Sequence, residues 1–198
     1  MCCCTHLLQK QRDAFGLSVF AEKLEIQTPA KSTVAHQKFL FAELDKLLVI
    51  PKIAKKTAIA SVLHQLSDSI HKRSLVILFS DCMEKGLSEA SAEEFFSALR
   101  HLKHNKHEII IFNVSDHTSE VHFNFDNRPH LFVDVETGEE LRIHPNEIKN
   151  SYLKQIDTFR TNLHLKCGQY GIELIDADIN QGFHHLLHTY LIKRNRMI

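Results

Sequence analysis

Glycine is scarce in this chain, with six residues in 198, and proline is scarcer still, with four. The glycines form neither a GxGxxG sequence nor a P-loop, which excludes the glycine-rich cradles that hold nucleotide phosphates. An excess of basic charge is missing too, because Lys plus Arg and Asp plus Glu both number 24. Surfaces for nucleic acid or anionic membranes normally carry such an excess, so neither partner is expected.

Long apolar runs are also absent. No run approaches the roughly 18 residues of a membrane span, and no basic region followed by an apolar stretch marks a secretory signal. The five cysteines are Cys2, Cys3, Cys4, Cys82 and Cys167. An odd count with three in a row is not a disulfide framework. We therefore expect a cytoplasmic protein without a membrane span.

The most informative stretch present is the apolar run 75–79, which ends at Ser80 and Asp81. Such a run predicts a strand that is buried on both faces, as in a parallel sheet. It places a hydroxyl and a carboxylate at the carboxyl end of the strand. Ligands bind at that edge in open α/β sheets.

Strand-like and helix-like hydrophobic patterns alternate along the chain. We expect strands over 14–20, 24–27, 75–80, 109–112 and 172–175. We expect helices from Ser32 or Thr33 to about 50, over 59–70 and 93–103, from Asn146 or Asn150 to about 167, and over 180–192. This alternation predicts an α/β fold with a mainly parallel sheet covered by helices on both faces. A single domain would span 1–198, with an irregular insert at 117–145 that holds a β-hairpin turning at Gly138.

Several segments, taken together and in order, resemble the DUF58 (domain of unknown function) family, which carries a von Willebrand factor A-like domain. The segments are Gln11–Phe20, Lys56–Ile59, Arg73–Asp81, Asp134–Glu139 and Tyr170–Glu173. The resemblance covers nearly the whole chain. It implies a three-layer, Rossmann-like α/β fold.

The von Willebrand A fold usually carries a metal-ion-dependent adhesion site built from an Asp-x-Ser-x-Ser run, a Thr and an Asp. The resemblance makes Thr57 and Asp81 the second and third of these elements, with Ser80 nearby. No Asp-x-Ser-x-Ser run occurs in the chain, and the chain begins inside what resembles the family's first helix. We therefore expect an amino-terminally truncated relative that lacks the family's first strand. Two protein oxygens hold Mg²⁺ weakly, so the site would be vestigial, with no cofactor unless the missing segment is supplied.

Three functions are compatible with these features. The first is a non-enzymatic protein-interaction domain of von Willebrand A type. For this function the resemblance implies a MoxR-type AAA+ ATPase as partner, because family members are often encoded beside one. The second is a metal-dependent hydrolase or phosphotransfer enzyme that uses Asp81. The third is an inert truncated remnant.

Other reactive side chains have simpler interpretations. Three histidines recur at a spacing of three near a helix end, and two more lie four residues apart in the last expected helix. Cysteine at position 82 has no evident histidine partner for nucleophilic catalysis. We expect His101, His104 and His107 to lie at a solvated helix end and Cys82 to be a structural thiol. His184 and His188 could clamp a metal, but no Glu lies between them as in a metalloprotease helix, so we expect no ligand role for them. We expect Asp176 and Asp178 to lie in a loop and to cap a helix.

Overall fold

The computed structural model describes residues 2–49, 58–82, 89–133 and 138–195. The chain divides into two compact units, Met1–Ala58 and Ile59–Ile198. The expectation of one domain over 1–198 stays a prediction.

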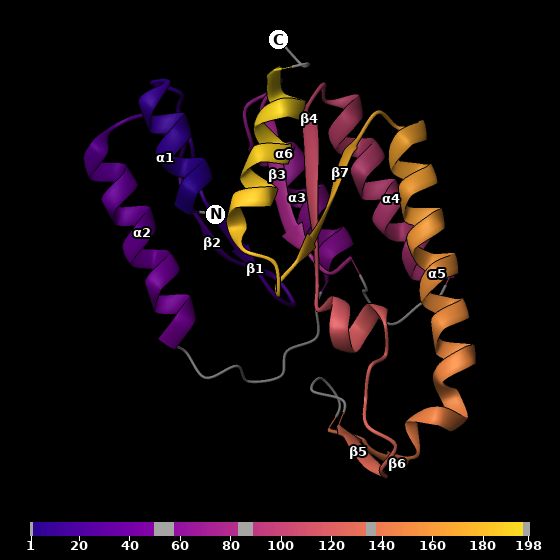
Figure 1. The fold of residues 1–198 in the computed structure, drawn as a ribbon. Helices are drawn as coiled ribbons and strands as arrows, with labels where there is room; N and C mark the ends of the chain where they lie inside the picture. Colours follow the sequence, from indigo (N-terminus) through magenta and orange to yellow (C-terminus); the bar gives the residue numbers. More distant parts are fainter. Residues whose placement is uncertain (1, 50–57, 83–88, 134–137, 196–198) are drawn as a thin grey trace. The chain divides into compact units, whose positions relative to one another are not determined.

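The first unit combines two helices with a short β-hairpin (Figure 1). Its elements are α1 (Cys2–Lys10), β1 (Ser18–Phe20), β2 (Leu24–Gln27) and α2 (Val34–Val49). The strands pair antiparallel, as predicted, and α2 begins where the Thr33 hydroxyl accepts a hydrogen bond from the backbone N–H of His36, at 3.2 Å. The first strand is shorter than predicted, because Phe15 forms an isolated antiparallel bridge with Lys31 instead of continuing the strand.

The second unit is built on a parallel sheet with the strand order β3–β4–β7. These strands are β3 (Leu75–Ser80), β4 (Glu108–Ser115) and β7 (Glu173–Asp178). Both pairs are parallel and in continuous register. The predicted α/β class with a mainly parallel sheet is thus confirmed.

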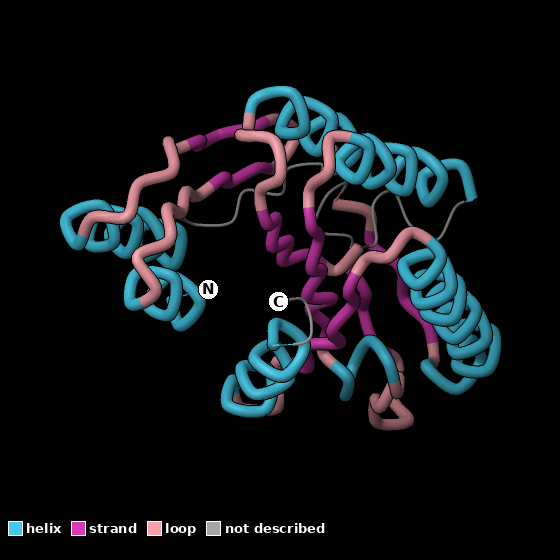
Figure 2. The backbone as a smooth tube through the Cα atoms, turned by 90° about the horizontal axis from the view of Figure 1, so that it is seen from above, coloured by secondary structure: helices cyan, strands magenta, loops and turns pink. Residues whose placement is uncertain are grey.

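Four helices cover this sheet. They are α3 (Ile59–Ser69), α4 (Glu89–His104), α5 (Pro145–Gln169) and α6 (Phe183–Asn195). Helix α6 lies on one face, and α3, α4 and α5 lie toward the other (Figure 2), so helices on both faces are confirmed as well. No helix in the described ranges combines the length and apolarity that a bilayer crossing requires.

The centre of the core is β4. Residues 109–112 of this strand are buried, and their exposed fractions do not exceed 3%. Strand β3 is less buried than predicted, since only Leu78 is fully covered and its neighbours are half-buried. Strand β7 lies at the other end of the three-stranded order, yet four of its six residues are buried.

The insert between β4 and α5 contains the predicted hairpin. It begins with one turn of π-helix, His117–Val121, and continues to β5 (His130–Val133) and β6 (Glu140–Ile143), which pair antiparallel. Gly138 has φ +74°, as a turn glycine at this position requires. The rest of the turn, residues 134–137, lies outside the described residues. Buried Phe123 anchors the hairpin by stacking on Phe132, with ring centroids 6.1 Å apart.

Helix α4 begins at Glu89, four residues before the predicted 93, and two other helices also begin at residues other than those predicted. Helix α5 starts at Pro145, whose fixed φ suits a first helical position, while the Asn146 side chain donates to Asn127 Oδ1 at 2.7 Å. Helix α6 starts at Phe183 rather than Asn180, because the Asn180 amide is engaged by carboxylates across the sheet edge. In both cases a tertiary contact takes the side chain that was expected to cap or open the helix.

Candidate functional site at the carboxyl edge of the sheet

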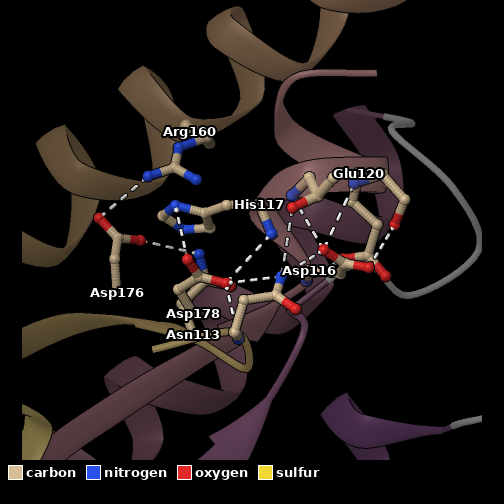
Figure 3. Close-up of polar contacts among 10 residues, drawn as sticks. Asn113, Asp116, His117, Glu120, Arg160, Asp176 and Asp178 are labelled. Atoms are coloured by element: carbon tan, nitrogen blue, oxygen red, sulfur yellow. Dashed lines mark hydrogen bonds and ion pairs between the residues drawn. The ribbon is translucent and has the colours of Figure 1, made fainter. Parts of the chain in front are cut away.

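The three strands of the second unit end side by side. Ser80 pairs with Asn113 in the register of β3 and β4, and Asn113 pairs with Asp176 in that of β4 and β7. Two residues further along both strands, Ser115 is aligned with Asp178. Contrary to the expected loop, Asp176 and Asp178 therefore belong to β7 itself. The strand ends thus bring polar side chains of β4 and β7 to one edge, where Asn113, Asp176 and Asp178 lie close together (Figure 3).

Asp176 joins the sheet to helix α5. Its Oδ1 accepts a hydrogen bond from Asn113 Nδ2 at 3.0 Å, and its Oδ2 lies 3.2 Å from Arg160 Nη2 and 2.9 Å from His164 Nε2. Burial by itself raises the pKa of Asp176, but the Asn113 hydrogen bond, Arg160 and His164 together outweigh it, so the pKa lies below its ordinary value. The carboxylate is therefore ionised at neutral pH and held from three directions.

Asp116 caps the π-helical turn that follows β4. Its carboxylate accepts hydrogen bonds from the backbone N–H groups of Thr118 and Ser119 and, at 2.7 Å, from the Ser119 hydroxyl. Glu120 reciprocates by accepting from the backbone N–H of Asp116 at 3.1 Å. The Ser119 hydroxyl is the main reason why the pKa of Asp116 is lowered, and an Asn180 hydrogen bond adds to the effect. This carboxylate too is fixed in its charged form.

Asp178 and Asn180 connect the end of β7 to the same turn. Asp178 Oδ1 accepts from the backbone N–H groups of Asn180, at 3.0 Å, and His117, at 3.3 Å. The Asn180 amide donates to Asp178 Oδ1 at 3.2 Å and to Asp116 Oδ1 at 2.6 Å. The Asn180 N–H is the largest influence lowering the pKa of Asp178. A single amide side chain thus links two ionised carboxylates.

Buried polar atoms without a protein partner concentrate at this edge. In the described part of the chain five such side-chain atoms occur, and three of them are Asn113 Oδ1, Ser115 Oγ and His117 Nε2. Buried polar atoms in proteins are normally satisfied by protein groups, ordered water or a ligand. The edge of the sheet therefore retains unused hydrogen-bonding capacity, although its carboxylates are well satisfied.

The residues that the resemblance associated with a metal lie at the end of β3. Asp81 is exposed, and the Ser80 hydroxyl contacts it at 3.5 Å while accepting from the backbone N–H of Cys82 at 3.1 Å. Thr57 lies outside the described residues, so the pairing of Thr57 with Asp81 stays a prediction. Across the described ranges, no group of three or more His, Cys, Asp or Glu side chains is arranged to hold a metal ion.

Cys82 is a buried thiol with φ +57°. Burial raises its pKa strongly, and the nearby charges of Asp81 and Asp176 act in the same direction. A thiol in this environment is a poor nucleophile, because the thiolate is the reactive form. This supports the structural interpretation of Cys82.

The edge also presents apolar surface. Ile179, which directly follows β7, is 63% exposed, and Phe183 at the start of α6 is 55% exposed. No Lys or Arg among the described residues forms an ion pair with Asp116 or Asp178; the nearest basic group is His117 Nδ1, 3.7 Å from Asp178 Oδ2. Fixed negative charge and exposed apolar side chains thus adjoin one another at residues 178–183.

Some residues of this network could be expected from the sequence, and others could not. Asn113 and Asp116 follow a predicted strand and could be placed at the edge. Arg160 and His164 lie in the middle of a long helix, where nothing in the spacing indicates a contact with β7. The sequence shows only that Arg160 and His164 are four residues apart, which places them one turn apart on the same face of a helix.

Comparison with known proteins gives a family but no function. The model of the family described as "Protein of unknown function DUF58" matches residues 1–161. Among solved structures, the chain is similar to an aerotolerance-related membrane protein from Bacteroides fragilis NCTC 9343, crystallised with multiple mutations to serines. The two share 15% identity over 89% of this chain and 80% of that one, with a TM-score of 0.46. Comparison with curated proteins gave no significant match. Because the family model covers well over half of its residues, the chain belongs to the DUF58 family.

Proposed function

We propose that this chain is a non-enzymatic protein-interaction domain of von Willebrand A type that binds a partner protein at the carboxyl edge of the β3–β4–β7 sheet. The carrying observation is that exposed Ile179 directly follows Asp178, with exposed Phe183 four residues further on, while the Asn180 amide ties Asp178 to Asp116. The partner that fits this surface offers apolar side chains beside basic ones. Following the family resemblance, we propose that it is a MoxR-type AAA+ ATPase.

The rigidity of the edge supports a binding role. Asp116 and Asp178 are held by backbone N–H groups and by one shared amide, so little side-chain freedom remains to be lost on association. Their charges have no Lys or Arg partner among the described residues, and complementary charge on a partner speeds encounter and fixes its register. Exposed aromatic residues such as Phe183 are frequent contributors to binding energy.

We also propose that this binding does not depend on Mg²⁺. The contacts described at residues 116 and 178–183 need no metal. The alternative function, a hydrolase or phosphotransfer enzyme, would depend on a metal ion bound beside Asp81.

The test is an affinity measurement between the purified chain and the MoxR-type ATPase of the same genome, with and without EDTA. We expect Phe183→Ser to weaken binding about tenfold. We expect Asp116→Asn to weaken it less, since Asn keeps one oxygen for the N–H groups of the helix cap and loses the charge and the acceptor of the Ser119 hydroxyl. Leu165→Ser is the matched control, because Leu165 on α5 is exposed to a similar extent, 59%. EDTA should leave the affinity unchanged.

Two results would contradict this proposal. An equal loss in Leu165→Ser and Phe183→Ser would show that the edge is not the contact. Turnover of a phosphate ester with Mg²⁺ or Mn²⁺ that disappears in Asp81→Asn would support the enzyme alternative instead.

A further inference from the structure

A histidine pair bridges helices α3 and α4, away from the sheet edge. His64 Nδ1 and His101 Nδ1 lie 3.0 Å apart, and the two ring centroids are separated by 5.2 Å. On the other side of the His101 ring, Nε2 lies 3.4 Å from Asp68 Oδ1. Spacing along the chain groups His101 with His104 and His107, but the structure pairs it with a residue 37 positions earlier.

The contacts of this pair favour one arrangement of its protons. Asp68 Oδ1 lies 3.4 Å from His101 Nε2, and a carboxylate accepts hydrogen bonds, so the arrangement with a proton on Nε2 of His101 suits this contact. In the neutral ring, Nδ1 then presents a lone pair toward His64, and His64 donates its own Nδ1 proton. Asp68 thereby orients the His101 ring with an imidazole lone pair pointing into the space between the helices.

The surrounding contacts hold the two rings in place. One turn further along the helices, Asn105 Nδ2 donates to Ser67 Oγ at 2.8 Å and to the Ser67 carbonyl at 3.1 Å, which fixes the axial position of α3 against α4. Leu63 and Leu102, each adjacent to a member of the pair, are buried with exposed fractions of 1% and 0%. The separation of the two ring nitrogens is thus set by the helix packing.

We propose that His64 and His101 form a binding site for a divalent transition-metal ion that prefers imidazole, such as Zn²⁺, Ni²⁺ or Cu²⁺. Imidazole nitrogens bind Zn²⁺ at about 2.0–2.1 Å in tetrahedral geometry, so two of them lie about 3.3–3.4 Å apart. The observed 3.0 Å must open by a few tenths of an ångström, and both rings must turn so that their lone pairs converge on the ion. His64 contributes a lone pair at Nδ1 by moving its proton to Nε2, which leaves the ring neutral and releases no proton.

Asp68 then occupies the position of an outer carboxylate. Metal-binding histidines almost always donate their other ring N–H to a carboxylate, a carbonyl or water, which fixes the tautomer and strengthens the ligand. No third His, Cys, Asp or Glu of the described residues completes the site, so the remaining positions fall to water or to an outside ligand. His107 takes no part, since it is buried and its Nδ1 accepts from the backbone N–H of Ser74 at 3.2 Å.

Calorimetric titration with NiCl₂, using the whole chain at pH 7.5, tests this inference, because imidazole is a good Ni²⁺ ligand. The wild-type chain should bind one Ni²⁺ more than either His64→Gln or His101→Gln. Asp68→Asn should keep this site but weaken it about tenfold, as loss of an outer carboxylate does. His188→Gln is the control, because His188 is exposed on α6, and it should keep the site unchanged.

An anomalous difference map from crystals soaked in NiCl₂ gives an independent readout. The inference requires a peak within bonding distance of both Nδ1 atoms. The same number of sites in His64→Gln, His101→Gln and wild type, or a map with peaks only at other histidines, would overturn it. Should either glutamine variant fail to fold by circular dichroism, the map and the exposed-site variant Asp68→Asn decide the question by themselves.

Discussion

Single residues at the carboxyl edge are held in two different ways. Asp176 has three side-chain partners from two elements, Asn113, Arg160 and His164, whereas Asp116 and Asp178 are bound chiefly by N–H donors and amides. Removal of the Asp176 carboxylate would leave its partners Asn113, Arg160 and His164 without an acceptor. Of the carboxylates at this edge, we therefore expect Asp176 to contribute most to stability.

Asp176→Asn should lower the free energy of unfolding by about 1–3 kcal/mol at pH 7, because Arg160 loses its charged partner and one amide must satisfy three donors. Since the pKa of Asp176 is lower in the folded state than in the unfolded chain, its contribution is complete above the unfolded pKa, about 4, and is lost as pH falls through the folded pKa. Guanidinium unfolding of wild type and variant from pH 7 to pH 3 measures this.

The difference between wild type and Asp176→Asn should shrink as the pH falls below about 4. A difference that stays constant over the whole range would show that the carboxylate charge contributes nothing. Arg160→Gln serves as a companion variant, because it removes the same ion pair from the other side. Its effect should have the same pH dependence.

At the scale of elements, the end of α5 shows how one backbone angle terminates a helix. Gly171 has φ +61°, and the N–H groups of Gly171 and Ile172 close the last turn on the carbonyls of Gly168 and Cys167, at 3.2 and 2.9 Å. This geometry, with a left-handed residue after the helix, favours glycine. The end of the helix was predicted correctly from the sequence, because the signal is local.

Gly171→Ala should lower the free energy of unfolding by about 1–2 kcal/mol, the cost of the left-handed conformation for an L-residue. A Cβ at this position would meet only Lys103 Nζ, at 3.9 Å, so crowding is not the cause. Gly168→Ala is the matched control three residues earlier, within α5 and with no atom within 4 Å of its Cβ. It should raise the stability by about 0.5–1 kcal/mol. Equal signs in thermal or chemical unfolding would contradict the account.

The elements that the sequence predicted well are those with a local cause. The apolar runs of β3 and β4, the hairpin at Gly138 and the end of α5 all follow from neighbouring residues. The starts of α5 and α6 were wrong because Asn146 and Asn180 use their amides for distant partners. Such contacts depend on the finished fold, so spacing along the chain could not reveal them.

The same distinction applies to the candidate site. Ser80, Asp81 and Asp116 could be assigned to the carboxyl edge because they directly follow apolar strands. Arg160 and His64 could not be assigned, since each meets its partner only after helices have packed. Spacing alone grouped His101 with His104 and His107, whereas the structure buries His107 and turns His101 toward α3.

For the molecule as a whole, we propose that function resides at the carboxyl edge of the sheet. The parallel order β3–β4–β7 directs all three strand ends to one side. There, Asp116 and Asp178 form a fixed acidic network beside the exposed Ile179 and Phe183. A partner that uses this edge must cover the π-helical turn and the start of α6 together, although they are some 60 residues apart in the sequence.

The most direct measurement is hydrogen exchange of the chain alone and in complex with the MoxR-type ATPase. Partner binding slows exchange where it covers or orders backbone amides. We expect slower amide exchange in the complex in two separate peptides, one spanning 116–123 and one spanning 178–187. Exchange at 59–69 in α3 should not change. Protection confined to other segments, with both of these peptides unchanged, would contradict this expectation.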